Sequence, residues 1–202
     1  MITNQNLILA SSSPRRLELL DKIGIIPNKV IPADIDETPK KAEKPYEYVK
    51  RVSLEKAMFV AKENAGSYII SADTAVIKGR TILGKPKDRS QAESFLNILS
   101  GGKHNVLTGF TVISPTGQAV TKVIKTVITL KRLSREEINW YLDSGEWEGK
   151  SGGYAIQGKF EMFVKQINGS ISNVVGLPLF NVYNTLTGMG YKFNYKADLN
   201  NE

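Results

Sequence analysis

The sequence has 202 residues, 41% of them hydrophobic, which is enough for one domain or two closely joined lobes around a substantial core. It contains no cysteine and a single histidine, His104, which excludes disulfides and thiolate catalysis and argues against a histidine-dependent triad or metal site. No segment approaches the ~20 apolar residues of a membrane span and no secretory signal is evident, so we expect a cytoplasmic protein. The net charge of +7 is dispersed along the chain, which favours a solvated surface or an anionic substrate over nucleic-acid binding.

Strand-like and helix-like patterns alternate along the chain, which predicts an α/β protein. In chain order, the expected strands are residues 7–10, 29–33, 67–72, 76–77, 81–83, 106–113 and 119–130. The expected helices begin at Pro14, span residues 46–63 and 91–99, and begin again at a capping box from Ser134 to Glu137, to end near Gly145. The tail beyond Tyr191 is polar, and we expect it to fray from about residue 192.

The stretch from Leu7 to Arg16 carries the most informative pattern. A buried strand leads into three serines, and Pro14 then opens a helix for which Ser13 is a suitable N-cap. Arg15 and its neighbour lie in the first helical turn, where the helix dipole already places positive charge. Free N–H groups, hydroxyls and two guanidiniums at one point predict a phosphate-binding site. An ordinary strand-to-helix turn with solvated arginines is the alternative.

Asp73 follows directly on the expected strand at residues 67–72. An acid at the carboxyl end of a strand lies where open α/β sheets bind their ligands. Such a carboxylate can hold a divalent cation or accept a proton from water. The alternative is an aspartate that only caps a turn.

Lys56 continues the apolar stripe of the second expected helix, at seven residues from Val49 and four from Val52. Phe59 and Val60 are expected on overlapping faces of the same helix. A lysine in such a stripe should point to the interior or to a cleft. The alternative is a side chain that runs along the helix edge with its ammonium group in solvent.

Two loops add weaker patterns. Pro86 restrains Lys85 on a stiff turn, which suits a phosphate contact but is also common on protein surfaces. In residues 150–158, glycines let the backbone approach a ligand, and Gln157 offers both a donor and an acceptor to a base edge. The alternative for this loop is an irregular glycine turn that Tyr154 anchors by packing.

Taken together, these patterns resemble the motifs of the Maf family of nucleoside triphosphate pyrophosphatases, over nearly the whole chain. The motifs stand in family order, and in this sequence they are Ala10-Ser-Ser-Ser-Pro-Arg-Arg16, Glu55-Lys56-Ala57, Ala72-Asp73-Thr74, Gly84-Lys85-Pro86, Gly153-Tyr154-Ala155-Ile156-Gln157-Gly158, Ile167-Asn-Gly169 and Val175-Gly-Leu-Pro-Leu179. Each motif alone is weak. The complete ordered set is what indicates the family.

The resemblance implies a single Maf-like domain over residues 1–202 with a two-lobed α/β fold like that of inosine triphosphatases. A central mixed sheet and an active-site cleft between the lobes belong to that fold. The implied activity is hydrolysis of a nucleoside triphosphate to the monophosphate and pyrophosphate, with a divalent cation, Mg²⁺ or Mn²⁺, as cofactor. The nucleotide is the implied partner and a homodimer is a further expectation, whereas neither a membrane nor nucleic acid is expected.

By the same resemblance, Asp73 is the general base and, together with Glu37, a ligand of the metal. Asp36 stands next to Glu37 in the sequence, so either carboxylate fits the family position. Lys56 and Lys85 complete the implied catalytic set.

The remaining implied site residues bind the substrate. Ser11, Arg15 and Arg16 resemble the family's triphosphate clamp, and Thr74 and Gln157 resemble specificity positions of the branch that prefers dTTP and UTP. Two alternatives stay open: a non-enzymatic regulator of cell division, and a pyrophosphatase selective for 7-methyl-GTP or inosine triphosphate.

Overall fold

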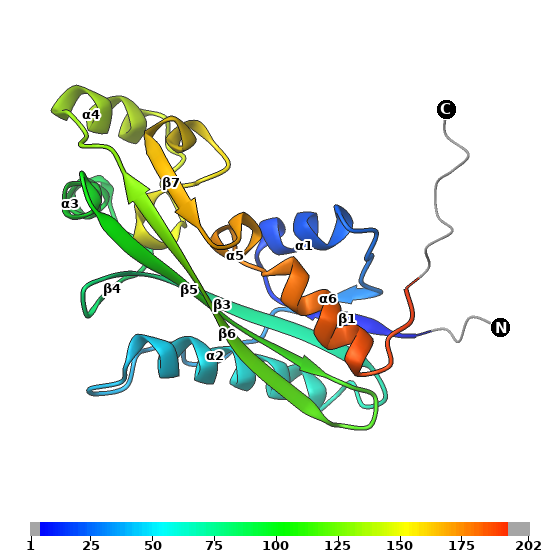
Figure 1. Ribbon diagram of the computed structural model, residues 1–202. Helices are drawn as coiled ribbons and strands as arrows, with labels where there is room; N and C mark the ends of the chain where they lie inside the picture. The colour runs from blue at the N-terminus through cyan, green and yellow to red at the C-terminus, as the bar shows by residue number, and fades with distance from the viewer. Residues whose placement is uncertain (1–4, 194–202) are drawn as a thin grey trace, which may run out of the picture.

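The computed structural model describes residues 5–193, which form a mixed seven-stranded sheet with helices on both faces (Figure 1). The strands are β1 (Leu7–Ala10), β2 (Lys29–Val30), β3 (Tyr68–Lys78), β4 (Thr81–Leu83), β5 (Lys103–Ile113), β6 (Ala119–Leu130) and β7 (Val164–Asn168). The helices are α1 (Pro14–Asp21), α2 (Pro45–Ala61), α3 (Arg89–Leu99), α4 (Arg135–Asp143), α5 (Ile171–Val175) and α6 (Leu179–Gly188), with 3-10 turns at Ser151–Gly153 and Lys159–Phe163. Within the described residues no helix is both long and apolar enough to cross a membrane.

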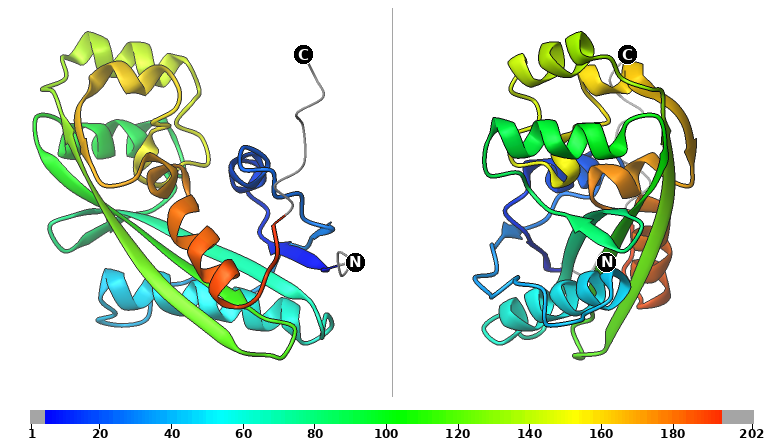
Figure 2. Two further views of the ribbon diagram at one scale, coloured as in Figure 1. Left: turned by 45° about the vertical axis from the view of Figure 1, so that its right-hand side comes forward. Right: turned by 90° about the vertical axis from the view of Figure 1, so that its left-hand side faces the viewer.

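The sheet runs in the order β2-β1-β3-β5-β6-β7, and β4 pairs with the second half of β3. β1 is parallel to β2 and to β3, whereas the pairs from β3 onward are antiparallel. The long strands β5 and β6 run through the length of the molecule (Figure 2). The expected α/β fold with a central mixed sheet is therefore confirmed.

Helices cover the two faces of the sheet differently. α2 lies along one face, where Val49 packs with Ala75 of β3. α1 and α6 lie against the other face, where Leu20 and Leu186 pack with Ile70 of β3 (Figure 2). α3 and α4 enclose a further apolar cluster at the other end of the long strands. Successive side chains of β3 alternate between these layers because a strand has a two-residue period.

β3 runs on past Asp73 to Lys78, although the sequence predicts a strand that ends just before this aspartate. The reason is β5, whose antiparallel ladder pairs with β3 without interruption on both sides of that position. On its other edge β3 has two short neighbours, since β1 pairs with it up to Ser71 and β4 pairs with it only from Val76. Residues 72–75 therefore have an open edge within the described part of the chain, and side chains on both faces of the sheet are accessible there.

Several predictions of helix and strand ends are confirmed. Ser134 Oγ accepts a hydrogen bond from the Glu137 amide at 3.2 Å, and the Glu137 carboxylate accepts one from the Ser134 amide at 2.9 Å, which is the expected capping box. The predicted bounds of β6 agree with the observed ones. The expected fraying tail lies mostly outside the described residues.

Three local expectations are wrong. The expected strand at residues 29–33 shortens to Lys29–Val30, because only these residues pair with β1. Phe59 is 41% exposed, since α2 buries the stripe through Lys56 and Val60 and turns Phe59 away from it. The Ser13 side chain makes no cap bond to α1.

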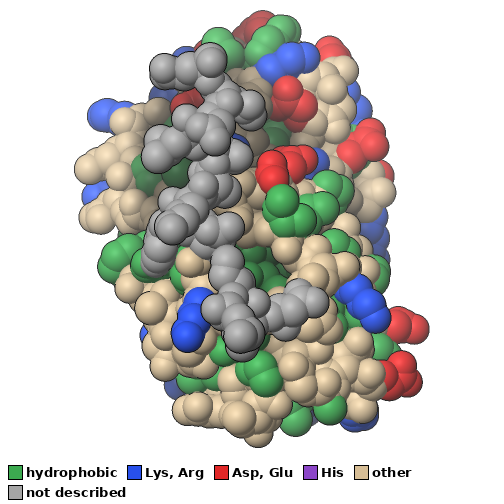
Figure 3. All heavy atoms as spheres, turned by 90° about the vertical axis from the view of Figure 1, so that its right-hand side faces the viewer, with side chains coloured by type: hydrophobic (Ala, Val, Ile, Leu, Met, Phe, Trp, Pro, Cys, Tyr) green, Lys and Arg blue, Asp and Glu red, His purple; other side chains and the backbone are tan. Residues whose placement is uncertain are grey.

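Charged side chains are interspersed over one face of the molecule (Figure 3). On the face seen in Figure 3, acidic and basic groups alternate with polar and hydrophobic ones, and the described atoms visible there form no continuous basic patch. This distribution is what the dispersed charge of the sequence predicts.

Candidate active site

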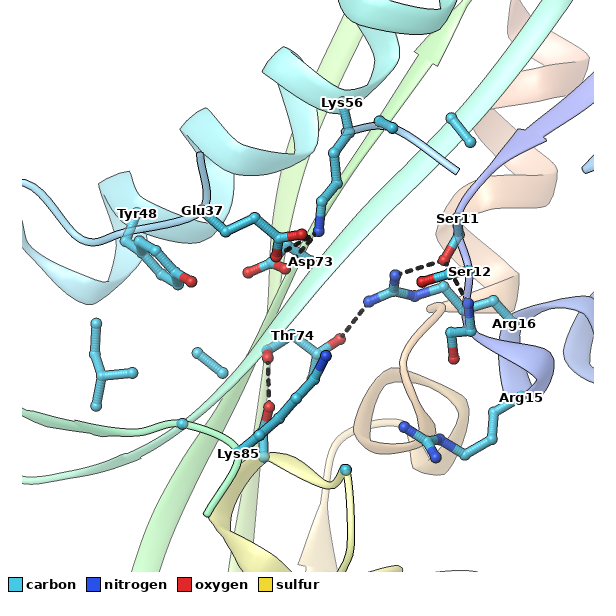
Figure 4. A pocket seen from close by; sticks show the side chains of 18 residues that line it. Ser11, Ser12, Arg15, Arg16, Glu37, Tyr48, Lys56, Asp73, Thr74 and Lys85 are labelled. Carbon is cyan, nitrogen blue, oxygen red and sulfur yellow. Dashed lines mark hydrogen bonds and ion pairs between the residues drawn. The ribbon is translucent and has the colours of Figure 1, made fainter. Parts of the chain in front are cut away.

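A cavity of about 250 Å³ opens at the open edge of β3, next to the end of β1. The segment between β1 and α1, the loop after β2, α2, β3 and the loop after β4 all contribute to its wall (Figure 4). Every expected site residue except Gln157 lines it: Ser11, Arg15, Arg16, Glu37, Lys56, Asp73, Thr74 and Lys85. Residues that lie up to 74 positions apart in the sequence thus surround one space.

A lysine joins two carboxylates on the α2 side of the cavity. Lys56 Nζ lies 2.8 Å from Glu37 Oε2 and 3.1 Å from Asp73 Oδ1. The side chains of Lys56 and Asp73 are each 10% exposed, whereas that of Glu37 is 45% exposed. Lys56 therefore points into the cavity and not along the helix edge to solvent, which decides between the two directions that the sequence leaves open.

Glu37, and not its neighbour, supplies the loop carboxylate. Asp36 turns away from the cavity, and its Oδ1 accepts a hydrogen bond from the Thr38 amide at 2.9 Å. Hydrogen bonding to the side chain of Thr38, and then to its amide, holds the pKa of Asp36 below its usual range. The choice that the sequence leaves open between the two acids is thus made by the local turn.

Two carboxylates at the cavity could contribute ligands to a cation. Lys56 occupies one oxygen of Asp73 and one of Glu37, and the second oxygen of each makes no hydrogen bond to another described residue. Within the described residues there is no cluster of three or more acids or histidines that could hold a metal. Two carboxylate oxygens fit Mg²⁺ or a similar hard cation, because such ions typically keep several waters and complete their shell with substrate phosphates.

Arg16 is fixed by three acceptors on the opposite side of the cavity. Its Nε donates to the Gly176 carbonyl at 2.9 Å, its Nη1 donates to Ser11 Oγ at 2.9 Å, and its Nη2 lies 3.5 Å from Thr74 Oγ1. Burial lowers the pKa of Arg16, and the nearby charge of Asp73 acts in the opposite direction. The guanidinium is therefore oriented before any ligand enters.

Two cationic side chains in the cavity wall have no polar partner among the described residues. Arg15 and Lys85 make no hydrogen bond or ion pair with another described residue, and both line the cavity (Figure 4). Partial burial lowers the pKa of Arg15. Since an arginine and a lysine offer only donors, this part of the wall suits an anion with several oxygens, such as a phosphate chain.

Gln157 lies in a second, smaller pocket that adjoins the first. The two pockets share Arg15, Thr74 and Ser151, and the smaller one is also lined by Tyr154 and Gln157. Tyr154 is anchored, because its hydroxyl lies 2.7 Å from Nε2 of the buried His104 and its ring stacks on Phe160. Tyr154 packs as the second interpretation of this loop predicts, and Gln157 stays exposed at the pocket.

An arginine outside the cavity holds the loop that carries Glu37. Arg51 of α2 donates two hydrogen bonds to Glu43, at 2.7 and 2.9 Å, and others to Glu55 at 2.9 Å and to the Thr38 carbonyl at 3.2 Å. The guanidinium lowers the pKa of Glu43 to about 2. This network fastens residues 38–43 to the helix that bears Lys56.

Some residues around the cavity have no signal in the chemical motifs. Tyr48 lines the wall two helical turns before Lys56, and this spacing on one helix face is the signal that could have found it. Ser151 donates to the Thr74 carbonyl at 3.0 Å. The Gly176 carbonyl that holds Arg16 lies 160 positions away in sequence, and no local pattern indicates that contact.

Comparison with known proteins agrees with this arrangement. The family model described as Maf-like protein matches residues 6–189, so the chain belongs to the Maf family. A protein of Zymomonas mobilis named dTTP/UTP pyrophosphatase is 48% identical over 98% of this chain and 98% of its own length. One of the same name from Caulobacter vibrioides is 45% identical over 95% of this chain and 100% of its own. A solved HAM1 protein from Coxiella burnetii has a TM-score of 0.49 and 13% identity over 91% of this chain and 99% of its own.

Proposed function

We propose that this chain hydrolyses dTTP and UTP to the nucleoside monophosphate and pyrophosphate. The observation that carries the proposal is the division of one cavity into two charged sides. Asp73 and Glu37 share Lys56 on one side. On the other side, Arg15 and Lys85 make no ion pair with another described residue. The names of full-length relatives that are 45–48% identical support the nucleotide class.

We propose Mg²⁺ or Mn²⁺ as the cofactor. The free oxygens of Asp73 and Glu37 are the protein ligands that would hold it. Bound there, a divalent cation neutralises phosphate charge and polarises the phosphoryl group.

In the proposed reaction, Asp73 is the general base. Lys56 bonds Asp73 Oδ1 and so holds this carboxylate at the cavity wall, where it accepts the proton of the attacking water. As the water oxygen bonds to the α-phosphorus, the bond from that phosphorus to the bridging oxygen breaks, and its electron pair leaves with pyrophosphate. Arg15 and Lys85 stabilise the negative charge that builds on the leaving group.

The adjoining pocket is proposed to hold the nucleobase. Gln157 supplies an amide donor and acceptor there. Thr74 and Arg15 lie in the wall common to both pockets, so Thr74 can face the base while Arg15 faces the phosphate chain.

Two further assignments stay proposals. We place the enzyme in the cytoplasm, where nucleoside triphosphates are its substrates. A homodimer stays a prediction, which light scattering of the purified protein would test.

The decisive experiment is a nucleotide panel with product analysis. The purified protein is incubated with dTTP, UTP, CTP, GTP, inosine triphosphate and 7-methyl-GTP in Mg²⁺ or Mn²⁺, and the products are separated by ion-exchange chromatography. We expect dTMP or UMP with pyrophosphate, and no activity in Asp73→Asn protein purified in the same way. A diphosphate with orthophosphate would place the cut at another bond. Turnover of none of the nucleotides would favour the regulator, and preference for 7-methyl-GTP or inosine triphosphate would favour the other enzyme class.

A further inference from the structure

A chain of hydrogen bonds runs from the cavity wall into the core behind it. Thr74 Oγ1 lies 2.9 Å from Oγ1 of Thr108 on β5, and Thr108 Oγ1 lies 2.8 Å from the carbonyl oxygen of Asn173 in α5. Thr108 and Asn173 are completely buried, whereas Thr74 is partly exposed in the wall of both pockets. The only end of this chain that a ligand can reach is Thr74.

The positions of the protons in these hydrogen bonds follow from the bond between Thr108 and the Asn173 carbonyl. A carbonyl oxygen can only accept, so the Thr108 hydroxyl donates its single proton to Asn173. No other donor serves that carbonyl among the described residues, because the amides of Gly176 and Leu177 both donate to Ser172. With its proton committed, Thr108 can only accept from Thr74, and Thr74 must donate inward.

Arg16 imposes the same orientation from the other side. Its Nη2 lies 3.5 Å from Thr74 Oγ1, and a guanidinium has donors only. Thr74 therefore turns its proton toward Thr108 and its lone pairs toward Arg16 and the cavity. Any group that enters beside it meets a hydrogen-bond acceptor.

An acceptor at this position excludes phosphate as the partner of Thr74. Phosphate oxygens of a bound triphosphate are acceptors and carry negative charge, so they belong with Arg15 and Lys85 and not with this hydroxyl. The partner of Thr74 must come from the nucleoside and must carry an N–H or O–H group.

We propose that Thr108 determines base selectivity by fixing Thr74 as an acceptor for the N3–H group of uracil or thymine. The proposal rests on the proposed function for its nucleotide class. Uracil and thymine present a donor at N3, whereas cytosine presents a lone pair at the same place of a ring of the same size. Thr74 therefore forms a hydrogen bond with uracil and thymine, whereas with cytosine its oxygen would face the N3 lone pair. Size alone cannot give this discrimination, because the rings are of the same size.

Thr108→Val tests the proposal because valine keeps the shape and removes the hydroxyl. Thr74 then has no inward acceptor, and its proton can turn to the cavity and meet the N3 lone pair of cytosine. We expect the ratio of kcat/KM for UTP to that for CTP to fall about two- to tenfold, the effect of one neutral hydrogen bond. Thr108→Ser keeps the hydroxyl and should keep the ratio.

Thr126→Val is the matched structural control. Thr126 is also a completely buried threonine that holds α5, because its hydroxyl donates to the Ser170 carbonyl at 3.1 Å and accepts from Asn173 Nδ2 at 3.0 Å. It makes no hydrogen bond with Thr74 or Thr108, so its loss disturbs the same helix without freeing the Thr74 proton. Its loss should lower the melting temperature by an amount similar to that for Thr108→Val and leave the UTP to CTP ratio unchanged. If a variant loses activity, the ratio is measured as Kd for α,β-imido analogues of the two nucleotides.

Each outcome decides the proposal. An unchanged ratio in Thr108→Val protein, or an equal drop in Thr126→Val protein, would overturn it while pyrophosphate release from UTP left the proposed function standing. The 3′-deoxy analogue of UTP distinguishes a sugar hydroxyl as the donor. If removal of the 3′-hydroxyl slows the native protein about tenfold and has no effect on Thr108→Val protein, Thr74 recognises the sugar and the N3 assignment is wrong.

Discussion

Gly109 on β5 lies directly opposite Asp73 on β3, so the two residues share the face of the sheet that α2 covers. A methyl group on Gly109 would lie 2.1 Å from the carbonyl oxygen of Val49 in α2. The missing side chain therefore lets the helix approach the sheet beside Asp73. Because α2 carries Lys56, this approach brings the ammonium group within 3.1 Å of the carboxylate.

Gly109→Ala should force α2 away from the sheet. We expect a loss of about 1–3 kcal/mol in the free energy of unfolding, as for other overpacked sites. Displacement of Lys56 should also lower kcat by about ten- to a hundredfold. Urea unfolding and steady-state kinetics measure the two effects. Gly188→Ala is the control, since nothing lies within 4 Å of the added methyl group; a similar loss there would contradict the explanation.

Asp73→Asn should remove the proton acceptor and keep the size of the side chain. A general base typically contributes ~10²–10⁴-fold, so kcat should fall by at least about that factor. The measurement is pyrophosphate release under single-turnover conditions, with circular dichroism to verify the fold. Near-normal turnover by a folded variant would remove Asp73 from the mechanism.

Arg15→Ala should slow all nucleotides by similar factors, because every triphosphate has the same phosphate chain. Loss of a hydrogen bond to a charged group is worth about 1.5–3 kcal/mol, or about 10–150-fold in kcat/KM. Gln157→Ala should instead compress the differences between bases, since its pocket adjoins the phosphate site and is separate from it. Values of kcat/KM for dTTP, UTP, CTP and GTP decide between them. A changed ranking in Arg15→Ala protein with a uniform loss in Gln157→Ala protein would reverse the two roles.

Arg51→Lys should loosen the loop that presents Glu37, because a lysine cannot make the paired hydrogen bonds to Glu43. We expect kcat/KM to fall by about tenfold or more through misplacement of the carboxylate. In a Glu37→Gln background the same change should have little further effect.

Arg89→Lys is the control for Arg51→Lys. Arg89 lies 2.7 Å from Asp143 in an exposed pair outside the cavity, so its replacement should leave kcat/KM unchanged. Additive losses in the Arg51 and Glu37 double variant would show that the arginine acts by another route.

His104 should make the protein less stable in acid. Burial and the charge of Lys78 lower its pKa to about 4, from 6.5 in an unfolded chain. Between these values the unfolded state binds a proton that the folded state does not, so stability is complete above pH 6.5 and falls as the pH falls. From about pH 7.5 to about pH 5 the loss should be roughly 2 kcal/mol. Urea unfolding of His104→Gln protein should show a shallower dependence on pH; an equal slope would contradict this.

Signals confined to a few neighbouring residues were sufficient for much of this fold. Spacing leaves two directions open for Lys56, whereas the capping box at Ser134 and the strand β6 follow from spacing within one element. The end of β3 does not, because its length is set by pairing with β5, which lies more than twenty residues further along the chain. Strand propensity around Asp73 contains no information about that partner.

The candidate site divides in the same way. The motifs indicate which residue types meet, and eight of the nine expected residues line one cavity. They do not indicate that Gln157 lies in the adjoining pocket, or that the Gly176 carbonyl orients Arg16. The first fact depends on the loop before β7 and the second on the segment after it. Contacts at that range leave no periodic pattern in the sequence.

The open edge at residues 72–75 has a consequence for how such an enzyme can change. Asp73 and Thr74 are consecutive, so they project to opposite faces of the sheet, and the gap between β1 and β4 makes both accessible from one opening. In the proposed function, the general base faces α2, whereas the residue proposed to select the base faces α5. Substitutions on the α5 side should therefore alter nucleotide preference and leave the groups proposed for hydrolysis in place.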